Sequence, residues 1–272
     1  MVLDCHIHVW DGQNDREAFK ASLSKAGIEG GIVISQCPSA YRKAEAEMND
    51  AERAEDVLKW TGNNPYLFPF YWIDPTEANA CEQVKMASEM GIKGFKVICD
   101  RFYPGDARAM KAYKAIAQTG KPLLFHSGII WNGRSSSRYN RPAEFEDLLE
   151  VDGLRFALAH VSWPWCDECI AVYGKYQNAY ESRPDLSVEM FIDLTPGTPD
   201  IYREDVLTKL HTVGYNIEDN LMFGTDCTSN DYDAERAVKQ VNYDNGIYDK
   251  LKLTNETRDK IYYKNLMRFI GA

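Results

Sequence analysis

Short runs of apolar residues alternate along this chain with longer segments in which apolar residues recur at helical spacing. Continuous apolar runs of strand length are typical of parallel strands that are buried on both faces. The runs predict eight strands, which are Val2–Val9, Gly31–Gln36, Leu67–Ile73, Gly94–Cys99, Pro122–His126, Arg155–His160, Leu186–Ile192 and Leu221–Asp226.

Helices are predicted between several of these strands, where Ala, Glu, Lys and Leu are frequent and apolar positions fall on one face. The clearest are Arg16–Ala26, Ala40–Trp60, Glu77–Met90 and Ala107–Thr119. Glycine often marks a helix stop because it readily adopts a left-handed backbone conformation. Four glycines fit that role, Gly27, Gly91, Gly120 and Gly214.

The alternation of strands and helices indicates either a closed barrel or a large open sheet. Histidines, a lysine and an aspartate lie on or at the ends of strands one, four, five, six and eight. Only a closed barrel gathers all these strand ends around one mouth. A chain of 272 residues also has the usual size of such a barrel. We therefore predict an α/β fold, a (β/α)8 TIM barrel of parallel strands, as a single domain over residues 1–272.

Four of the five histidines lie at or near the end of a predicted strand. Imidazole nitrogens and carboxylate oxygens are the usual ligands of zinc-like divalent cations. Since a barrel brings these strand ends together, the pattern predicts a metalloenzyme. The candidate ligands are His6 and His8 in the first strand, His126 at the end of the fifth, His160 at the end of the sixth and Asp226 at the end of the eighth.

The spacing of His6 and His8 is the strongest local signal, because alternate residues of a strand point to the same face. Asp4 shares this spacing and is expected to accept the second N–H of a ligand imidazole. Plainer interpretations remain open: the histidines would serve packing or capping, and Asp226 would cap the following helix. His211 lies off the pattern in a predicted helix and is interpreted as a surface residue.

Together these motifs resemble the amidohydrolase superfamily: a His-x-His pair on the first strand, histidines ending the fifth and sixth, and Gly224-Thr225-Asp226 on the eighth. The most similar branch is the amidohydrolase-related one (amidohydrolase family 2), which includes metal-dependent hydrolases and decarboxylases. The resemblance extends from Asp4 to Gly271 and implies the same barrel. It also implies His6, His8, His126 and Asp226 as metal ligands, with His160 as a second-metal ligand or an acid–base residue.

Lys96 bears on the number of metal ions. The segment around it resembles the fourth strand of binuclear members, where a carbamylated lysine bridges two cations. The alternatives are a lysine paired with an inward acid such as Asp4, or one that extends toward the mouth. The expected cofactor is thus a divalent metal, most simply zinc, as one ion or two.

Substrate contacts are expected from the loops that follow the strands. The candidates are Trp10, Arg101, Trp131, Arg138 and Trp163. Arginines in these loops favour an anionic substrate, because guanidinium forms bidentate pairs with carboxylates; solvated loop charge is the alternative. The arginines are Arg101, Arg134, Arg138 and Arg141.

The net charge of −10 and the pI near 5.1 argue against nucleic acid or an anionic membrane as partner. The first residues resemble no secretory signal, and an odd number of cysteines, seven, suits reduced thiols, so we expect a cytoplasmic protein. Cys166 and Cys169 have the spacing of a redox motif, but structural thiols are favoured. A small molecule is the expected partner, and the sequence leaves a homo-oligomer open.

The leading functional hypothesis is hydrolysis of a small anionic amide, lactone or ester by a metal-activated water. Asp226 would accept the proton, and His160 or the metal would polarise the carbonyl. The alternative is a metal-dependent decarboxylase, in which Arg101 or an arginine of the strand-five loop grips the carboxylate. A non-catalytic metal site is a third hypothesis, less favoured because structural zinc is closed by four ligands.

Overall fold

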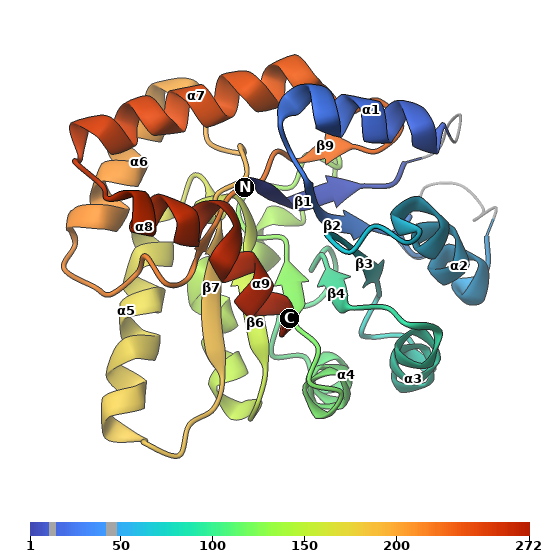
Figure 1. Cartoon of the computed structure of the whole chain (residues 1–272). Coiled ribbons are helices and arrows are strands. Elements are labelled where there is room, and N and C mark those ends of the chain that lie inside the picture. The colour runs from blue at the N-terminus through green and yellow to red at the C-terminus, as the bar shows by residue number, and fades with distance from the viewer. Residues whose placement is uncertain (11–14, 42–47) are drawn as a thin grey trace.

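The computed structural model describes residues 1–10, 15–41 and 48–272. Within these residues, parallel strands form a ring that is surrounded by helices (Figure 1). The pairing order is β8-β7-β6-β5-β4-β3-β2-β1-β9. The strands are β1 (Leu3–His8), β2 (Gly30–Ile34), β3 (Leu67–Trp72), β4 (Gly94–Val97), β5 (Leu123–Phe125), β6 (Arg155–Leu158), β7 (Glu189–Asp193), β8 (Leu221–Met222) and β9 (Cys227–Thr228).

The ring closes through two short strands in place of the predicted eighth strand Leu221–Asp226: β8 begins it, and β9 follows its predicted end. β8 pairs with β7, and β9 pairs with β1. Between them, the Cys5 N–H donates to the Phe223 oxygen over 2.9 Å, and the Asp226 N–H donates to the His6 oxygen over 3.0 Å. The predicted (β/α)8 barrel is confirmed. The predicted uninterrupted strand to Asp226 is wrong, because Asp226 has a left-handed φ of 58° that a strand cannot contain.

The four helices predicted from the sequence are present, but two start later than predicted, at Asp50 and at Ala80. The helix predicted from Ala40 begins at Asp50, because Asn49 and Glu52 form a capping box; residues 42–47 lie outside the described residues. No helix of the described chain is both long and apolar enough to cross a bilayer. The helices are α1 (Arg16–Ala26), α2 (Asp50–Thr61), α3 (Ala80–Met90), α4 (Ala107–Gln118), α5 (Cys166–Ser182), α6 (Asp200–Thr212), α7 (Ala234–Lys250), α8 (Asn255–Asp259) and α9 (Asn265–Ile270).

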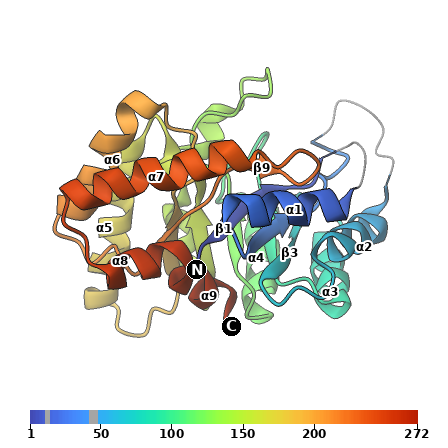
Figure 2. The ribbon, with the colours of Figure 1, turned by 45° about the horizontal axis from the view of Figure 1, so that its top comes forward.

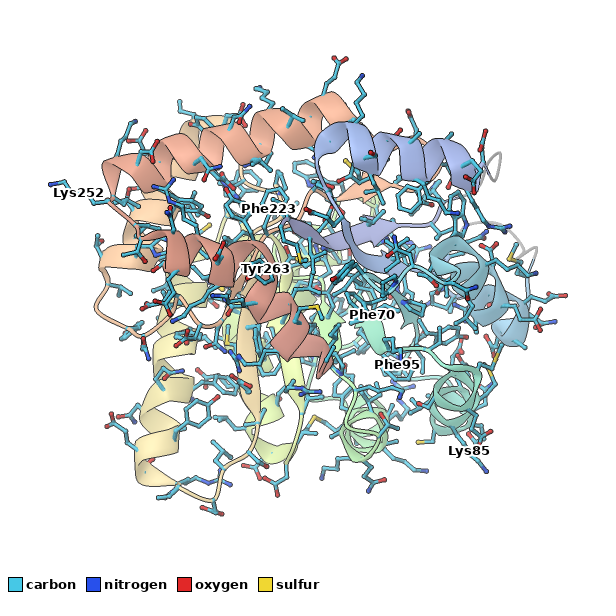
Figure 3. The ribbon with its side chains drawn as sticks, viewed as in Figure 1. Phe70, Lys85, Phe95, Phe223, Lys252 and Tyr263 are labelled. Carbon is cyan, nitrogen blue, oxygen red and sulfur yellow. The ribbon has the colours of Figure 1, made fainter. Side chains whose placement is uncertain are left out.

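The core has an outer layer between strands and helices and an inner layer inside the ring. Phe70 lies in the inner layer, whereas Lys85 and Lys252 extend outward from the surface (Figure 3). The helix α9 closes one end of the ring, since Leu266 and Phe269 belong to the inner layer. The N-terminus lies beside this closed end (Figure 1), so the ligand-bearing strand ends open on the opposite side.

A β-bulge in β1 determines which of its side chains face inward. Leu3 and Cys5 belong to the inner layer, but Ile7 and Val9 belong to the outer one. The register against β2 shifts between Asp4 and Ile7, as expected where one extra residue is inserted. His6 and His8 therefore face the inside together with Cys5, while Asp4 faces outward.

Candidate metal centre and active site

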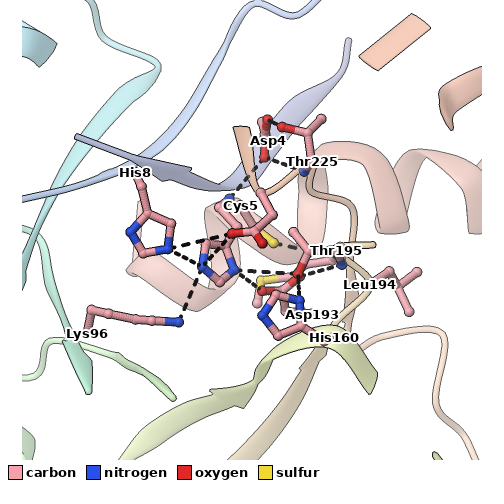
Figure 4. Close-up of polar contacts among 12 residues, drawn as sticks. Asp4, Cys5, His8, Lys96, His160, Asp193, Leu194, Thr195 and Thr225 are labelled. Carbon is pink, nitrogen blue, oxygen red and sulfur yellow. Dashed lines mark hydrogen bonds and ion pairs between the residues drawn. The ribbon is translucent and has the colours of Figure 1, made fainter. Parts of the chain in front are cut away.

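The predicted ligands converge at the open end of the barrel. The Nε2 atoms of His6 and His8 lie 3.0 Å apart. Each lies 3.6 Å from the same carboxylate oxygen, Asp226 Oδ1. His160 joins them, because one ligand atom each from His6, His160 and Asp226 fall within 4.8 Å of one another. Figure 4 shows how the side chains from β1, β4 and the ends of β6 and β7 meet.

This donor set fits a zinc-like cation. Zinc ligands at 2.0–2.1 Å in a tetrahedral site lie about 3.3 Å from one another, close to the spacing of these three atoms. Burial holds the pKa values of His6 and His8 well below the usual range, so both imidazoles are neutral at pH 7 and offer a lone pair. Burial also raises the pKa of Asp226, which a nearby cation would offset.

His126 is held differently from the pair on β1. It follows β5, and its Nε2–H donates to the Ile129 oxygen over 3.1 Å. This hydrogen bond leaves the Nδ1 lone pair available, in contrast to the Nε2 atoms that His6 and His8 direct at each other. Its ring centre lies 5.0 Å from that of His160, so His126 borders the same cluster.

His160 lies two residues beyond the end of the strand that it was predicted to close. The strand β6 ends at Leu158, and His160 lies in the 3-10 turn Ala159–Ser162. Its left-handed φ of 62° is incompatible with a strand, so the prediction that His160 ends the sixth strand is wrong in detail. The turn still places His160 at the barrel mouth, where burial lowers its pKa to about 4.

Asp193 and Thr195, at the end of β7, were missed by the sequence analysis. The His6 Nδ1–H donates to Asp193 Oδ2 over 2.6 Å. The other oxygen of Asp193 accepts from the Thr195 N–H and hydroxyl over 2.7 and 2.5 Å. The available signal was a polar residue directly after the apolar run Leu186–Ile192.

The role predicted for Asp4 is wrong. Because of the bulge, Asp4 accepts hydrogen bonds from Thr225 and Tyr232 rather than from an imidazole. Burial raises the pKa of Asp4 to about 6. Asp193 takes the predicted role, and Asp4 instead fixes the backbone that leads to Asp226.

Lys96 points into the same cluster from β4. It is fully buried, and its Nζ lies 3.3 Å from His6 Nε2. The outward-facing Asp4 is not its partner; the carboxylates that act on it are Asp193 and Asp226. Burial lowers the pKa of Lys96 to about 8, although Asp193 and Asp226 act in the opposite direction. Whether it bridges two ions stays a prediction.

A cavity of about 570 Å³ opens over the ligand cluster. It is bordered by His8, His126, His160 and Asp226, and its other lining residues include an aromatic wall beside isoleucines and small residues. Three predicted substrate contacts belong to this wall, and one of them, Trp131, is 81% exposed at the rim. Figure 2 shows the green loop after β5 standing clear of the helices. The aromatic wall consists of Trp10, Tyr41, Trp131 and Trp163.

The loop arginines, unlike the aromatic side chains, do not line the cavity. Among the described residues that line the cavity there is no arginine or lysine. Arg138 donates to the Tyr139 hydroxyl over 2.8 Å and stacks on that ring. The contacts of Arg101 and Arg138 with substrate therefore stay predictions. The other loop arginines pair with carboxylates, Arg101 with Asp74, Arg134 with Asp100 and Arg141 with Glu168.

Two other expectations concern residues outside the cluster. His211 is not a surface residue: its Nε2 is buried without a hydrogen-bond partner in the described structure, and its ring packs on Tyr248. Cys166 and Cys169 are free thiols, and burial raises their pKa values to about 11 and about 12, opposite to a reactive redox pair.

The sequence model of one family, described as amidohydrolase, matches residues 3–271. The chain belongs to the amidohydrolase family. This family is metal-dependent, which agrees with the cluster of candidate metal ligands in this chain. A search of curated proteins found no significant match.

Solved structures match the whole amidohydrolase chain at low sequence identity. A probable 2-pyrone-4,6-dicarboxylic acid hydrolase from Acinetobacter baumannii is 11% identical, with a TM-score of 0.63 and coverage of 100% of this chain and 99% of that one. A 2,6-dihydroxybenzoate decarboxylase is 12% identical, with a TM-score of 0.66 and coverage of 100% and 98%. A zinc-bound amidohydrolase from Burkholderia multivorans is 12% identical, with a TM-score of 0.65 and coverage of 100% and 99%. At these identities the likeness shows the fold alone.

Proposed function

We propose that this amidohydrolase is a metal-dependent hydrolase of a small amide, lactone or ester. The observation that carries the proposal is the position of Asp226. Its Oδ1 lies 3.6 Å from the Nε2 atoms of both His6 and His8, and its side chain is one-third exposed toward the cavity. Asp226 thus connects the cation ligands with the space where a substrate would bind.

The residues would divide the work as follows. His6, His8, His126 and Asp226 would hold a divalent cation, which supplies Lewis acidity and an activated water. The Asp226 carboxylate accepts the proton of the attacking water and returns it to the leaving group.

The Nε2 atom of His160 is suited to accept a proton or bind a cation rather than to donate a hydrogen bond. Its Nδ1 lies 3.2 Å from the Thr195 hydroxyl oxygen, and that hydroxyl already gives its own proton to Asp193. His160 Nδ1 must then be the donor, so the neutral ring presents a lone pair at Nε2. This arrangement favours a ligand or base role for His160 over polarisation of a carbonyl.

The cavity favours a planar substrate over a strongly charged one. Aromatic side chains supply apolar, flat contact surfaces, whereas the loop arginines are engaged with other side chains. The expectation of an anionic substrate rested mainly on those arginines, and it therefore loses its main support. A carboxylate on the substrate would depend on the cation for recognition.

Decarboxylation is the second candidate, and the aromatic wall favours it. Trp10, Tyr41, Trp131 and Trp163 suit an aromatic ring. His160 would take up a proton at its free Nε2 and pass it to the ring carbon after CO2 departs. The same cluster serves either reaction, because fold and metal leave the chemistry open.

The test is a substrate panel run on zinc-loaded protein. Lactones such as 2-pyrone-4,6-dicarboxylic acid, amides and esters are followed by pH-stat, and hydroxybenzoates by CO2 release. Proton release without CO2 supports hydrolysis; CO2 release identifies the second candidate. Asp226→Asn is expected to lower hydrolysis by about 10²- to 10⁴-fold, the usual worth of a general base. Full activity of Asp226→Asn would refute the base role, and Asp219→Asn, a surface change, is the control.

A further inference from the structure

We propose that Asp193 and Thr195 form one hydrogen-bonded unit that sets the tautomers of two histidines, His6 and His160. In this arrangement both rings carry their proton on Nδ1 and keep the Nε2 lone pair available to a cation. The inference rests on the metal site of the proposed function but not on which reaction occurs there. Figure 4 shows Asp193 and Thr195 beside the His160 ring.

The first half of the argument concerns Asp193. It is fully buried, and an ionised carboxylate can only accept hydrogen bonds. Its carboxylate contacts the Thr195 N–H, the Thr195 hydroxyl and His6 Nδ1, at 2.7, 2.5 and 2.6 Å, and it also hydrogen-bonds the Cys5 thiol. Each must therefore be a donor. A neutral imidazole has one N–H, so a proton on His6 Nδ1 leaves Nε2 unprotonated, 3.0 Å from His8 Nε2.

The second half concerns Thr195. Its hydroxyl proton is committed to Asp193, through a short charge-assisted bond. The hydroxyl oxygen then offers only lone pairs to His160 Nδ1, which lies 3.2 Å away. His160 Nδ1 must donate, and one buried carboxylate thereby orients a ligand histidine directly and an acid–base histidine through a hydroxyl.

The other two histidines of the cluster lie outside this unit. His8 Nδ1 is buried and has no hydrogen-bond partner among the described residues. His126 is fixed in the opposite sense, with Nε2–H donating to a backbone carbonyl. The control over the Nδ1–H tautomer is thus specific to His6 and His160, and His126 serves as an internal reference with the other tautomer.

Asp193→Asn is the sharpest perturbation. An amide has one oxygen and one NH2 group, whereas all the neighbours of Asp193 are donors. If the NH2 faces His6, Nδ1 must become the acceptor and the proton moves to Nε2, where it blocks a cation. If the NH2 group faces Thr195 instead, it opposes the Thr195 N–H, and two donors cannot form a hydrogen bond. We expect a 10- to 100-fold loss of zinc affinity, the usual effect of losing such an orienting group.

The experiment uses the full-length protein with ¹⁵N-labelled histidine and long-range ¹H–¹⁵N NMR spectra in the presence of a chelator. The five histidines are few enough to assign by single substitutions. In the wild type, we expect Nδ1–H for His6 and His160 and Nε2–H for His126. A wild-type His6 with its proton on Nε2 overturns the proposal without any variant having to fold.

Three variants test the two halves separately. Asp193→Asn should change the His6 tautomer and weaken zinc binding. Asp4→Asn alters an equally buried carboxylate that bonds the His6 backbone N–H but no imidazole ring, so it should leave the His6 tautomer unchanged. Thr195→Val should alter His160 alone, because the Thr195 backbone N–H still supports Asp193. Thr195→Ser should restore the wild-type spectrum.

The outcomes separate this inference from the metal site. A folded Asp193→Asn protein that keeps the Nδ1–H tautomer of His6, with zinc affinity within 3-fold of wild type, overturns the role of Asp193. An unchanged His160 in Thr195→Val overturns the role of Thr195. Failure of the wild type to bind zinc in calorimetry refutes the metal site, while the tautomer measurement still decides the present inference.

Discussion

The closure of the barrel by α9 predicts a large loss of stability for Phe269→Ala. Phe269 is fully buried, and its ring centre lies 5.0 Å from that of Phe191 and 6.3 Å from that of Phe70. Truncating a buried phenylalanine to alanine costs about 3–5 kcal/mol, from lost transfer free energy and the cavity left behind. The upper value applies here, because a rigid ring of strands cannot collapse around the cavity.

The measurement is the free energy of unfolding in urea, followed by tryptophan fluorescence and far-UV circular dichroism with a chelator in all samples. The chelator matters because a cation that binds only the folded state adds stability of its own. Phe269→Leu, which keeps most of the apolar volume, should lose less than half as much. Ile201→Ala, on an 82% exposed residue of α6, should stay within about 0.5 kcal/mol of wild type. A loss below about 1 kcal/mol in Phe269→Ala, with an unchanged denaturant slope, would mean that α9 does not seal the core.

The other predictions concern the metal, a buried histidine and the cavity rim. Zinc at about 100 times its dissociation constant should stabilise chelator-treated protein by about 2.7 kcal/mol; thermal melts with no shift would contradict the site. Burial lowers the pKa of His211 from 6.5 to about 4, so the unfolded chain takes up the proton first and stability falls as pH drops through that interval. His211→Phe should lose less stability than wild type between pH 7 and about 4.5 in urea titrations. Trp131→Ala should leave stability within about 0.5 kcal/mol, since the side chain is 81% exposed, yet raise KM for the substrate found; an unchanged KM would exclude Trp131 from binding.

The barrel and most of the ligand cluster could be predicted from the sequence because both depend on local patterns. Buried parallel strands require continuous apolar runs, and candidate ligands such as His126 and Asp226 stand out as polar residues where those runs stop. Asp193 follows the same rule. The predicted strand Leu186–Ile192 stops one residue before the observed strand, so Asp193 was left outside it and was missed.

The errors came from features that the local pattern does not encode. Nothing in Leu3–His8 reveals the bulge, since Asp4, His6 and His8 alternate regularly in the sequence while the inserted residue changes the side on which Asp4 lies. The arginine partners depend on long-range pairing, such as Arg134 with Asp100. The sequence pattern therefore does not show that these loop arginines form ion pairs within the protein.

The sealed end of the barrel has a practical consequence for experiments. Residue 1 precedes β1 and residue 272 follows α9, so both ends of this chain lie on the side away from the cavity (Figures 1 and 2). Tethering the protein to a sensor chip or bead through either end should leave the mouth directed at the solution. Two proteins immobilised through opposite ends should then capture small ligands equally well.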